Sequence, residues 1–170
     1  MIEVKNLRKQ YGPVVAVSDI SFEVGKGEII GFLGPNGAGK TTTMRVLTGF
    51  SPPTAGTAVI AEFDVVKQPV EVKKRVGYLP ESVPLYTDMI VRSFLDYVAT
   101  VKSVTRPKRK AEVDRVMERS GLTHMADRLI GNLSKGYRQR VGLAQSLIGN
   151  PPVLILDEPT VGLDPNQIVE

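Results

Sequence analysis

Apolar residues in this 170-residue chain come in short runs separated by glycine- and proline-rich turns, a pattern typical of alternating strands and helices. Residues 29–33 form a continuous apolar run, as expected for a strand that is buried on both faces. Weaker alternation or shorter apolar runs predict further strands at residues 2–7, 14–17, 21–24, 57–60, 75–79 and 153–156. The pattern as a whole predicts an α/β fold.

Apolar residues at helical spacing predict four helices. Residues 40–47 follow a glycine-rich loop and form the first of them. Residues 91–101 and 108–119 each carry apolar side chains on one face, and they indicate a helical insertion of roughly 50 residues. The fourth helix is predicted over residues 134–149, where an Asn-Pro-Pro sequence ends it.

The composition narrows the class of protein. With 42% hydrophobic and 24% charged residues, it matches an ordinary soluble globular domain. The absence of cysteine excludes disulfides and thiolate metal sites. No run reaches the roughly 18 uninterrupted apolar residues of a membrane span, and the first residues lack a signal-peptide pattern. We therefore expect that this chain does not cross a membrane by itself.

The net charge of +4 is concentrated in a basic segment over residues 102–110. A solvated helix start explains this segment most simply, and contact with anionic lipid or nucleic acid is the alternative. Aromatic residues do not interleave with the basic ones, so the segment offers no platform on which bases could stack. We expect no nucleic-acid partner.

The segment GPNGAGKT at residues 34–41 fits the phosphate-loop pattern G-x-x-x-x-G-K-[ST], and it lies between a predicted strand and a predicted helix. Glycines let backbone N–H groups point toward a polyphosphate, and the helix adds the positive end of its dipole. Lys40 offers an ammonium group to the outer phosphates, and Thr41 offers a hydroxyl to Mg²⁺. The predicted nucleotide-binding residues here are Gly34, Pro35, Asn36, Gly37, Ala38, Gly39, Lys40, Thr41 and Thr42.

Two acids, Asp157 and Glu158, directly follow the apolar strand predicted at residues 153–156. Ligands of open α/β sheets bind at the carboxyl ends of the strands. Asp157 would hold Mg²⁺, directly or through water, and Glu158 would act as the general base for an attacking water. A surface pair or a helix cap is the alternative, which the phosphate loop upstream makes less favourable.

Ser134 is the expected N-cap of the fourth helix. Its hydroxyl and the N–H of Gly136 would face outward and form a second anion site. Two phosphate-binding ends in one chain suggest a nucleotide held between two copies, whereas a plain helix cap is the simpler alternative. Nucleoside kinases and small GTPases do not need this segment, and the guanine-reading Asn-Lys-x-Asp is absent from the sequence.

The phosphate loop, the Ser134 segment and the two acids, in this order along the chain, resemble the ATP-binding domain of ABC transporters. Residues 34–41 resemble its Walker A motif, residues 154–158 its Walker B motif with the catalytic glutamate, and LSKGY at 133–137 its LSGGQ signature. The segment ending in Asp164 resembles the D-loop. The similarity runs along the entire chain, and the signature makes it more specific than a phosphate loop alone.

The resemblance implies a P-loop NTPase (RecA-like) core with an antiparallel β subdomain and a helical insertion. Residues 1–84 would form the β subdomain and phosphate-loop core, 85–135 the helical subdomain, and 136–170 the signature helix, Walker B and D-loop. In the family, a further strand with a switch histidine follows the D-loop. We therefore expect a single, truncated domain that lacks the C-terminal part of its core, and a surface position for the only histidine, His124.

The resemblance also assigns roles to further residues. Tyr11 would stack on adenine, and Ala16 would make a second adenine contact. Glu81 replaces the glutamine of the family's Q-loop, and it would lie near Mg²⁺ together with Thr41 and Asp157. The residues expected to act across the interface between two copies are Ser134, Lys135 and Gly136 of the signature and Asp164 of the D-loop.

The implied function is that of an ATP-binding and ATP-hydrolysing subunit of a membrane transporter, with ATP and Mg²⁺ as ligands. The sequences at 77–81 and 133–140 resemble ATPases of ABC-2 type exporters. Such a subunit would pair with a second ATP-binding subunit and with separate transmembrane permeases, on the cytoplasmic face of the membrane. A soluble ABC-type ATPase that acts on ribosomes or DNA, and a non-catalytic nucleotide-binding remnant, are the alternatives. The 170 residues alone are expected to bind ATP weakly and to hydrolyse it negligibly.

Overall fold

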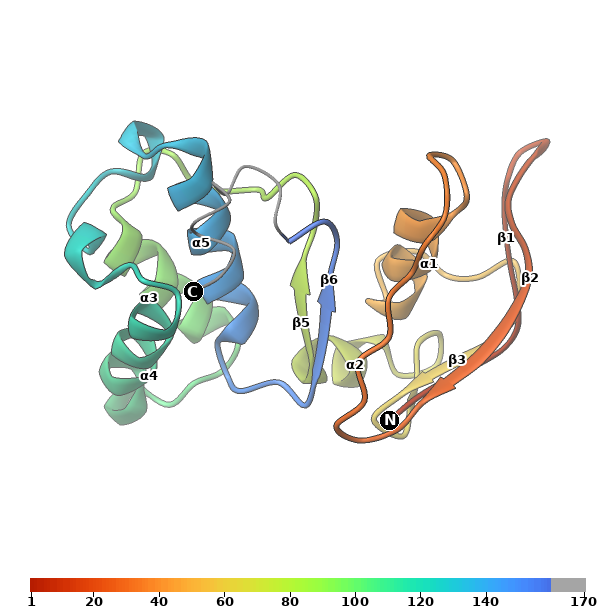
Figure 1. Cartoon of the computed structure of the whole chain (residues 1–170). Coiled ribbons are helices and arrows are strands. Elements are labelled where there is room, and N and C mark those ends of the chain that lie inside the picture. The colour runs from red at the N-terminus through yellow and green to blue at the C-terminus, as the bar shows by residue number, and fades with distance from the viewer. Residues whose placement is uncertain (160–170) are drawn as a thin grey trace. The chain divides into compact units, whose positions relative to one another are not determined.

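The part of the chain that the structure describes contains two small β-sheets, each with helices in its own unit (Figure 1). The computed structural model describes residues 1–159. The chain divides into two compact units, Met1–Val76 and a second that begins at Gly77, and each is described by itself. Within the described residues, no helix has both the length and the apolar character needed to cross a bilayer.

The first unit is built on an antiparallel sheet in the order β2-β1-β3-β4. The central strand β1 (Ile2–Tyr11) pairs with β2 (Val14–Val24) on one side and with β3 (Ala55–Ile60) on the other, and β4 (Phe63–Asp64) continues from β3. Apolar side chains of β1 and β3 are buried because alternate residues of a strand face the same side. The predicted strands at 14–17 and 21–24 are one strand, with register shifts along β1.

Two helices accompany this sheet. Helix α1 (Lys40–Leu47) has the predicted bounds and buries Val46 and Leu47. Helix α2 (Pro69–Arg75) was not predicted; of its seven residues only Val72 is buried. Its ends carry a proline in the first turn and basic residues in the last, and Glu71 forms ion pairs with two of them. A helix that is stabilised mainly by charge pairs has no apolar periodicity, so the sequence pattern did not predict it.

The strand predicted at residues 29–33 is wrong for this structure. The segment has no regular secondary structure, and the side chains of Ile29 and Leu33 are 98% and 96% exposed. A strand needs a neighbour to pair with its backbone N–H and C=O groups, and within residues 1–159 neither sheet includes this segment. Phe32 is the one residue of this segment that is not classed as exposed, and the centre of its ring lies 5.2 Å from that of Phe22 on β2.

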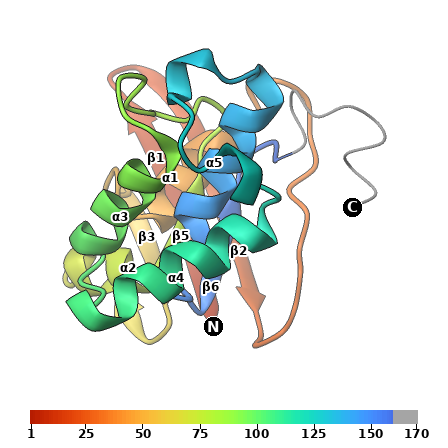
Figure 2. The same cartoon turned by 90° about the vertical axis from the view of Figure 1, so that its left-hand side faces the viewer.

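The second unit combines a two-stranded sheet with a helical core. Strands β5 (Val76–Leu79) and β6 (Val153–Leu156) lie side by side, and their arrows point the same way in Figure 1. Helices α3 (Val91–Val101), α4 (Arg106–Arg119) and α5 (Lys135–Leu147) pack against one another (Figure 2), and the short 3₁₀ turns η1 (Thr123–Met125) and η2 (Ile130–Asn132) connect α4 to α5.

Small residues let α5 approach β5 closely. A Cβ atom on Gly77 of β5 would collide with the backbone carbonyl oxygen of Ser146 on α5. A Cβ atom on Gly142 of α5 would lie 2.7 Å from a methyl group of Val83, just beyond β5. The helix that begins at the predicted signature is therefore held against the strand that leads to Glu81.

Candidate nucleotide-binding site

The phosphate loop of the first unit ends in an open helix N-terminus. Gly37 and Gly39 adopt positive φ angles of 83° and 85°, a conformation that glycine takes without strain. Gly39 is the N-cap of α1, and no side chain caps this end of the helix. Uncapped N–H groups and the positive end of the helix dipole together favour an anion at this position.

Lys40 closes the loop on itself. Its ammonium group donates hydrogen bonds to the carbonyl oxygens of Gly34, at 2.7 Å, and of Pro35, at 2.9 Å. Because the side chain is solvent-accessible, the ammonium can leave these carbonyls for a phosphate oxygen, which is a stronger, charge-assisted partner. The lysine is thus held near the position where a polyphosphate would lie.

Ala16 of β2 lies against the phosphate loop, and its contact with adenine stays a prediction. A Cβ atom on Gly39 would collide with the carbonyl oxygen of Ala16 and would lie 3.0 Å from a methyl group of Val17. Tyr11 is the last residue of β1 and is half exposed, and the ammonium of Lys9 lies 4.7 Å from the centre of its ring. Stacking of Tyr11 on adenine remains a prediction.

In the second unit, the predicted catalytic acids lie at the end of the two-stranded sheet. Asp157 directly follows β6, and its backbone N–H donates to the carbonyl oxygen of Leu79 at the end of β5. Glu81 comes two residues after that carbonyl. The sheet thus brings Asp157, Glu158 and the segment of Glu81 to one edge, although 75 residues lie between Glu81 and Asp157.

Asp157 is only 4% exposed, and within residues 1–159 its buried Oδ2 has no hydrogen-bond partner. A buried carboxylate oxygen without a partner is costly, and a catalytic role or a bound ion is one explanation for its retention. The described residues contain no cluster of three or more acidic or histidine side chains. Mg²⁺ needs no such cluster, because it commonly uses one or two carboxylates together with water and substrate phosphates. The unpartnered Oδ2 of Asp157 suits this kind of Mg²⁺ coordination.

Glu158 differs from Asp157 in both exposure and backbone. Its side chain is exposed, and its φ angle of 50° lies in the left-handed region that is unfavourable for residues with a Cβ atom. Such strain is retained where it orients a functional group. The backbone therefore directs Glu158 away from the buried position of its neighbour, which suits an acid that must meet a water molecule.

The signature segment has the predicted cap. Ser134 Oγ accepts a hydrogen bond from the N–H of Tyr137 at the start of α5, and Ser134 and Lys135 are exposed whereas Gly136 is buried. Sequence reasoning gave His124 no role, and the structure places its ring on Tyr137. The contact between His124 and Tyr137 could not be predicted from the sequence, because the two residues belong to different elements. The D-loop residue Asp164 lies outside the described residues.

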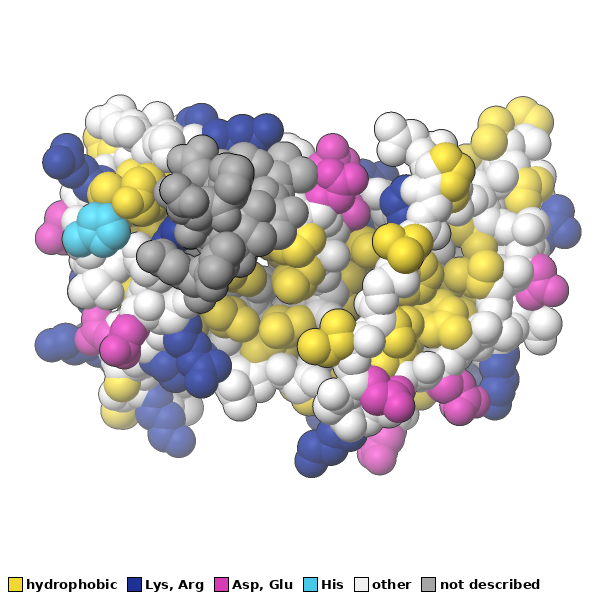
Figure 3. Space-filling view, viewed as in Figure 1, with side chains coloured by type: hydrophobic (Ala, Val, Ile, Leu, Met, Phe, Trp, Pro, Cys, Tyr) yellow, Lys and Arg dark blue, Asp and Glu magenta, His cyan; other side chains and the backbone are white. Residues whose placement is uncertain are grey.

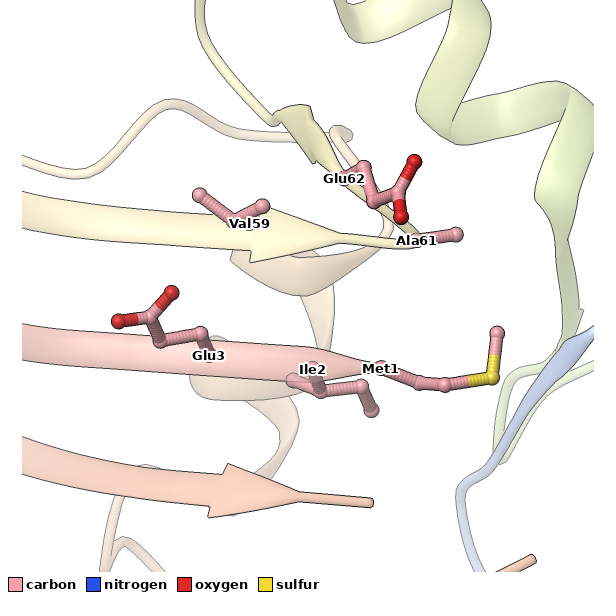
Figure 4. Close-up of a pocket in the computed structure, with 6 residues that line it drawn as sticks. All are labelled: Met1, Ile2, Glu3, Val59, Ala61 and Glu62. Carbon is pink, nitrogen blue, oxygen red and sulfur yellow. The ribbon is translucent and has the colours of Figure 1, made fainter. Parts of the chain in front are cut away.

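A groove of about 500 Å³ in the first unit holds none of the predicted site residues (Figure 4). It lies beside the ends of β1 and β3. Its lining combines apolar side chains with two carboxylates: Met1, Ile2, Glu3, Val59, Ala61 and Glu62. The two charged side chains of this open groove are both acidic and do not suit a phosphate, so the groove is not part of the predicted site.

A family model described as "ABC transporter" matches residues 17–161, which include the phosphate loop, the signature and both acids. The chain belongs to the ABC transporter ATP-binding family. This ABC domain is 41% identical over 152 residues to the "ABC transporter ATP-binding protein NatA" of Bacillus subtilis (strain 168), a match that covers 89% of this chain and 62% of that protein. It is 40% identical over 164 residues to the "Nod factor export ATP-binding protein I" of Burkholderia orbicola (strain AU 1054), a match that covers 96% of this chain and 54% of that protein.

The fold of this ABC domain also matches solved structures. One, described as "Structure of ATP binding subunit of ABC transporter", superposes with a TM-score of 0.90 at 28% identity, covering 99% of this chain and 70% of that chain. The predicted α/β, P-loop NTPase fold class is confirmed by this likeness. The chain spans 54–62% of the length of the two curated relatives above.

Proposed function

We propose that this ABC domain binds and hydrolyses ATP as the motor subunit of a membrane transporter of the export type. Membership of the family supports ATP as the bound nucleotide. Similarity to a protein named for Nod factor export supports export as the direction of transport. The observation that carries the proposal is the pair of adjacent acids: a buried, unpartnered Asp157 oxygen beside an exposed, backbone-strained Glu158.

The nucleotide would be held by the first unit. Tyr11 would stack on adenine, and Ala16 beside Gly39 would contact the base or ribose. Backbone N–H groups of the loop and of the first turn of α1 would bind the phosphates, because they lack side-chain caps. Lys40 would exchange its two carbonyl partners for oxygens of the outer phosphates.

Hydrolysis would use the acids of the second unit. Asp157, Thr41 and Glu81 would hold Mg²⁺, which when bound neutralises charge on the phosphates. Glu158 would accept a proton from a water molecule as that water attacks the γ-phosphorus. The bond between the γ-phosphorus and the bridging oxygen then breaks, giving ADP and inorganic phosphate.

Each site would be completed by a second copy. Ser134, Lys135 and Gly136 of one copy would meet the γ-phosphate bound by the other, and Asp164 would lie at the interface between them. An exposed serine and lysine at an anion-favouring helix start suit that role. The paired subunits would bind separate transmembrane permeases on the cytoplasmic face of the membrane and drive them by closing and reopening.

Glu158→Gln in the full-length protein tests this proposal. We expect ATP turnover to fall at least about 100-fold, in line with the loss of a general base, while ATP binding persists and dimers accumulate in size-exclusion chromatography with ATP. Glu118→Gln, at an exposed position on α4, is the matched control and should keep the parent rate. Parent-level hydrolysis by Glu158→Gln would show that the base is another residue.

A further inference from the structure

The 3₁₀ turn η1 presents His124 on a rigid support. Leu122 before it is fully buried, and its N–H donates to the carbonyl oxygen of Met117 at 2.8 Å. The N–H of Met125 then donates to the carbonyl oxygen of Leu122, also at 2.8 Å, and Ala126 is buried. His124 is exposed, but its backbone is anchored on both sides by the helical core. Figure 3 shows this single histidine, in cyan, at the surface.

The ring of His124 meets the first turn of α5 through Tyr137. Its Nε2 lies 3.0 Å from the hydroxyl of Tyr137, and the two rings stand edge to face with centres 5.6 Å apart. The guanidinium of Arg140 lies 5.9 Å from the centre of the same tyrosine ring. A Cβ atom on Gly121, just before η1, would collide with the Arg140 side chain. Two side chains of α5 therefore rest on the segment that carries His124.

Tyr137 also takes part in the N-cap. Its backbone N–H donates to Ser134 Oγ at 3.3 Å, a long hydrogen bond for an N–H donor. The first turn of a helix has the fewest internal hydrogen bonds and frays most easily. A tyrosine whose ring is held from outside the helix restricts this turn in a way that the weak cap alone does not.

We propose that His124 is a positioning residue for ATP turnover, because it holds Tyr137 and thereby the Ser134 hydroxyl in the geometry that receives the partner copy's γ-phosphate. The inference rests on the proposed function, in which this hydroxyl helps to complete the site of the other subunit. His124 itself touches no nucleotide. Its effect is on the closed, ATP-bound dimer and leaves the phosphate loop of the same chain unchanged.

The test uses four variants of the full-length protein: His124→Ala, Tyr137→Phe, the double variant and His124→Gln. We expect the first two to lower kcat by similar factors of about fivefold, the size of one ordinary hydrogen bond. The double variant should lose no more than either single one, since both remove the same contact. His124→Gln should recover part of the loss, because its amide can still hydrogen-bond the tyrosine hydroxyl.

Two readouts separate positioning from a general loss of stability. The affinity of monomeric protein for ATP, measured at low protein concentration, should be unchanged. The variants should lower Tm by no more than the control Thr123→Ala, which changes an exposed residue in the same turn. Parent-level kcat in His124→Ala, additive losses in the double variant, or a kcat loss matched by weaker ATP binding overturns the inference. A parent protein that does not hydrolyse ATP overturns the proposed function instead, and the inference with it.

Discussion

The backbone N–H of Asp157 donates a hydrogen bond to the carbonyl oxygen of Leu79, with 2.8 Å between the two atoms. This bond extends the pairing of β6 with β5 by one residue beyond the end of β6. It fixes Asp157 at the sheet edge where the segment of Glu81 also begins. The backbone thus fixes an acid at this edge, although the side chain of that acid is buried.

Asp157→Asn should separate stability from function. The buried Oδ2 has no partner within residues 1–159, and removing its charge relieves a desolvation cost. We expect Tm without nucleotide to rise by roughly 2–4 °C, the usual shift for about 1 kcal/mol in a chain of this size. The additional stabilisation by ATP with Mg²⁺ should be lost. Thermal melts with and without Mg-ATP measure both effects.

Asp127→Asn, at an exposed position, is the control for this variant and should change neither value. A lower Tm for Asp157→Asn without nucleotide would mean that the carboxylate stabilises the fold by itself.

Lys40→Gln should weaken ATP binding with little change in the fold. The ammonium group donates to the loop carbonyls of Gly34 and Pro35, and the residue is partly exposed. Losing a charge-assisted hydrogen bond costs about 1.5–3 kcal/mol, or roughly 10- to 100-fold in Kd. Calorimetric titration with ATP measures this change. Lys26→Gln, in the exposed turn before residues 29–33, should bind ATP as the parent does, and equal losses in both variants would refute the assignment.

Glu112 links α4 to the end of α5. It accepts two hydrogen bonds from Arg115, at 2.9 and 2.7 Å, and one from the N–H of Gly149 at 2.7 Å, and its side chain is only 16% exposed. The hydrogen bonds from Arg115 hold the pKa of Glu112 below its usual value of 4.5, and the Gly149 N–H adds to this effect. Glu112→Ala removes these three hydrogen bonds, while Arg115 Nη2 keeps the carbonyl oxygen of Leu147 as a partner. The substitution should cost about 1–3 kcal/mol of unfolding free energy at pH 7.

The pH dependence of this cost follows from the direction of the pKa shift. A carboxyl whose pKa is lowered by folding adds stability above its unfolded pKa and loses that part as the pH falls through its folded pKa. The difference between parent and Glu112→Ala should therefore shrink as the pH falls below about 4.5. Denaturant titrations at pH 7 and at several acidic values measure it, and a difference that grows with acidity would contradict the linkage.

Gly77→Ala should destabilise the second unit by about 1–3 kcal/mol, the usual cost of overpacking. The added Cβ atom would collide with the backbone carbonyl of Ser146, which cannot move without shifting α5. Gly31→Ala adds the same atom where nothing lies within 4 Å, and it should stay within about 0.5 kcal/mol of the parent. Urea denaturation compares the two, and equal stability would show that α5 can move at little cost.

Local signals in the sequence predicted several elements well. The bounds of α1, α3 and β6 agree with the predicted residues, and Ser134 caps α5 as expected. These elements have strong apolar periodicity or a clear cap and turn at their ends. Residues close by in the sequence therefore set where each element begins and ends. The phosphate loop is equally local, because its glycine conformations and helix start lie within a few residues of one another.

Tertiary pairing decided what these local signals could not. Residues 29–33 have the apolar content of a buried strand, but a strand exists only where a neighbour completes its hydrogen bonds. Helix α2 and strand β4 have weak patterns and were not predicted, since α2 is held by charge pairs and β4 by its pairing with β3.

By itself, the sequence predicted which residues carry the chemistry: the glycine loop with Lys40, the adjacent acids, and the capped signature helix. Their predicted roles follow from residue type and spacing, which do not depend on distant contacts. Only the tertiary structure decided that Asp157 is buried with an unpaired oxygen, that Glu158 has a strained backbone, and that His124 touches Tyr137. These properties depend on segments far apart in the chain, whose meeting is set by packing.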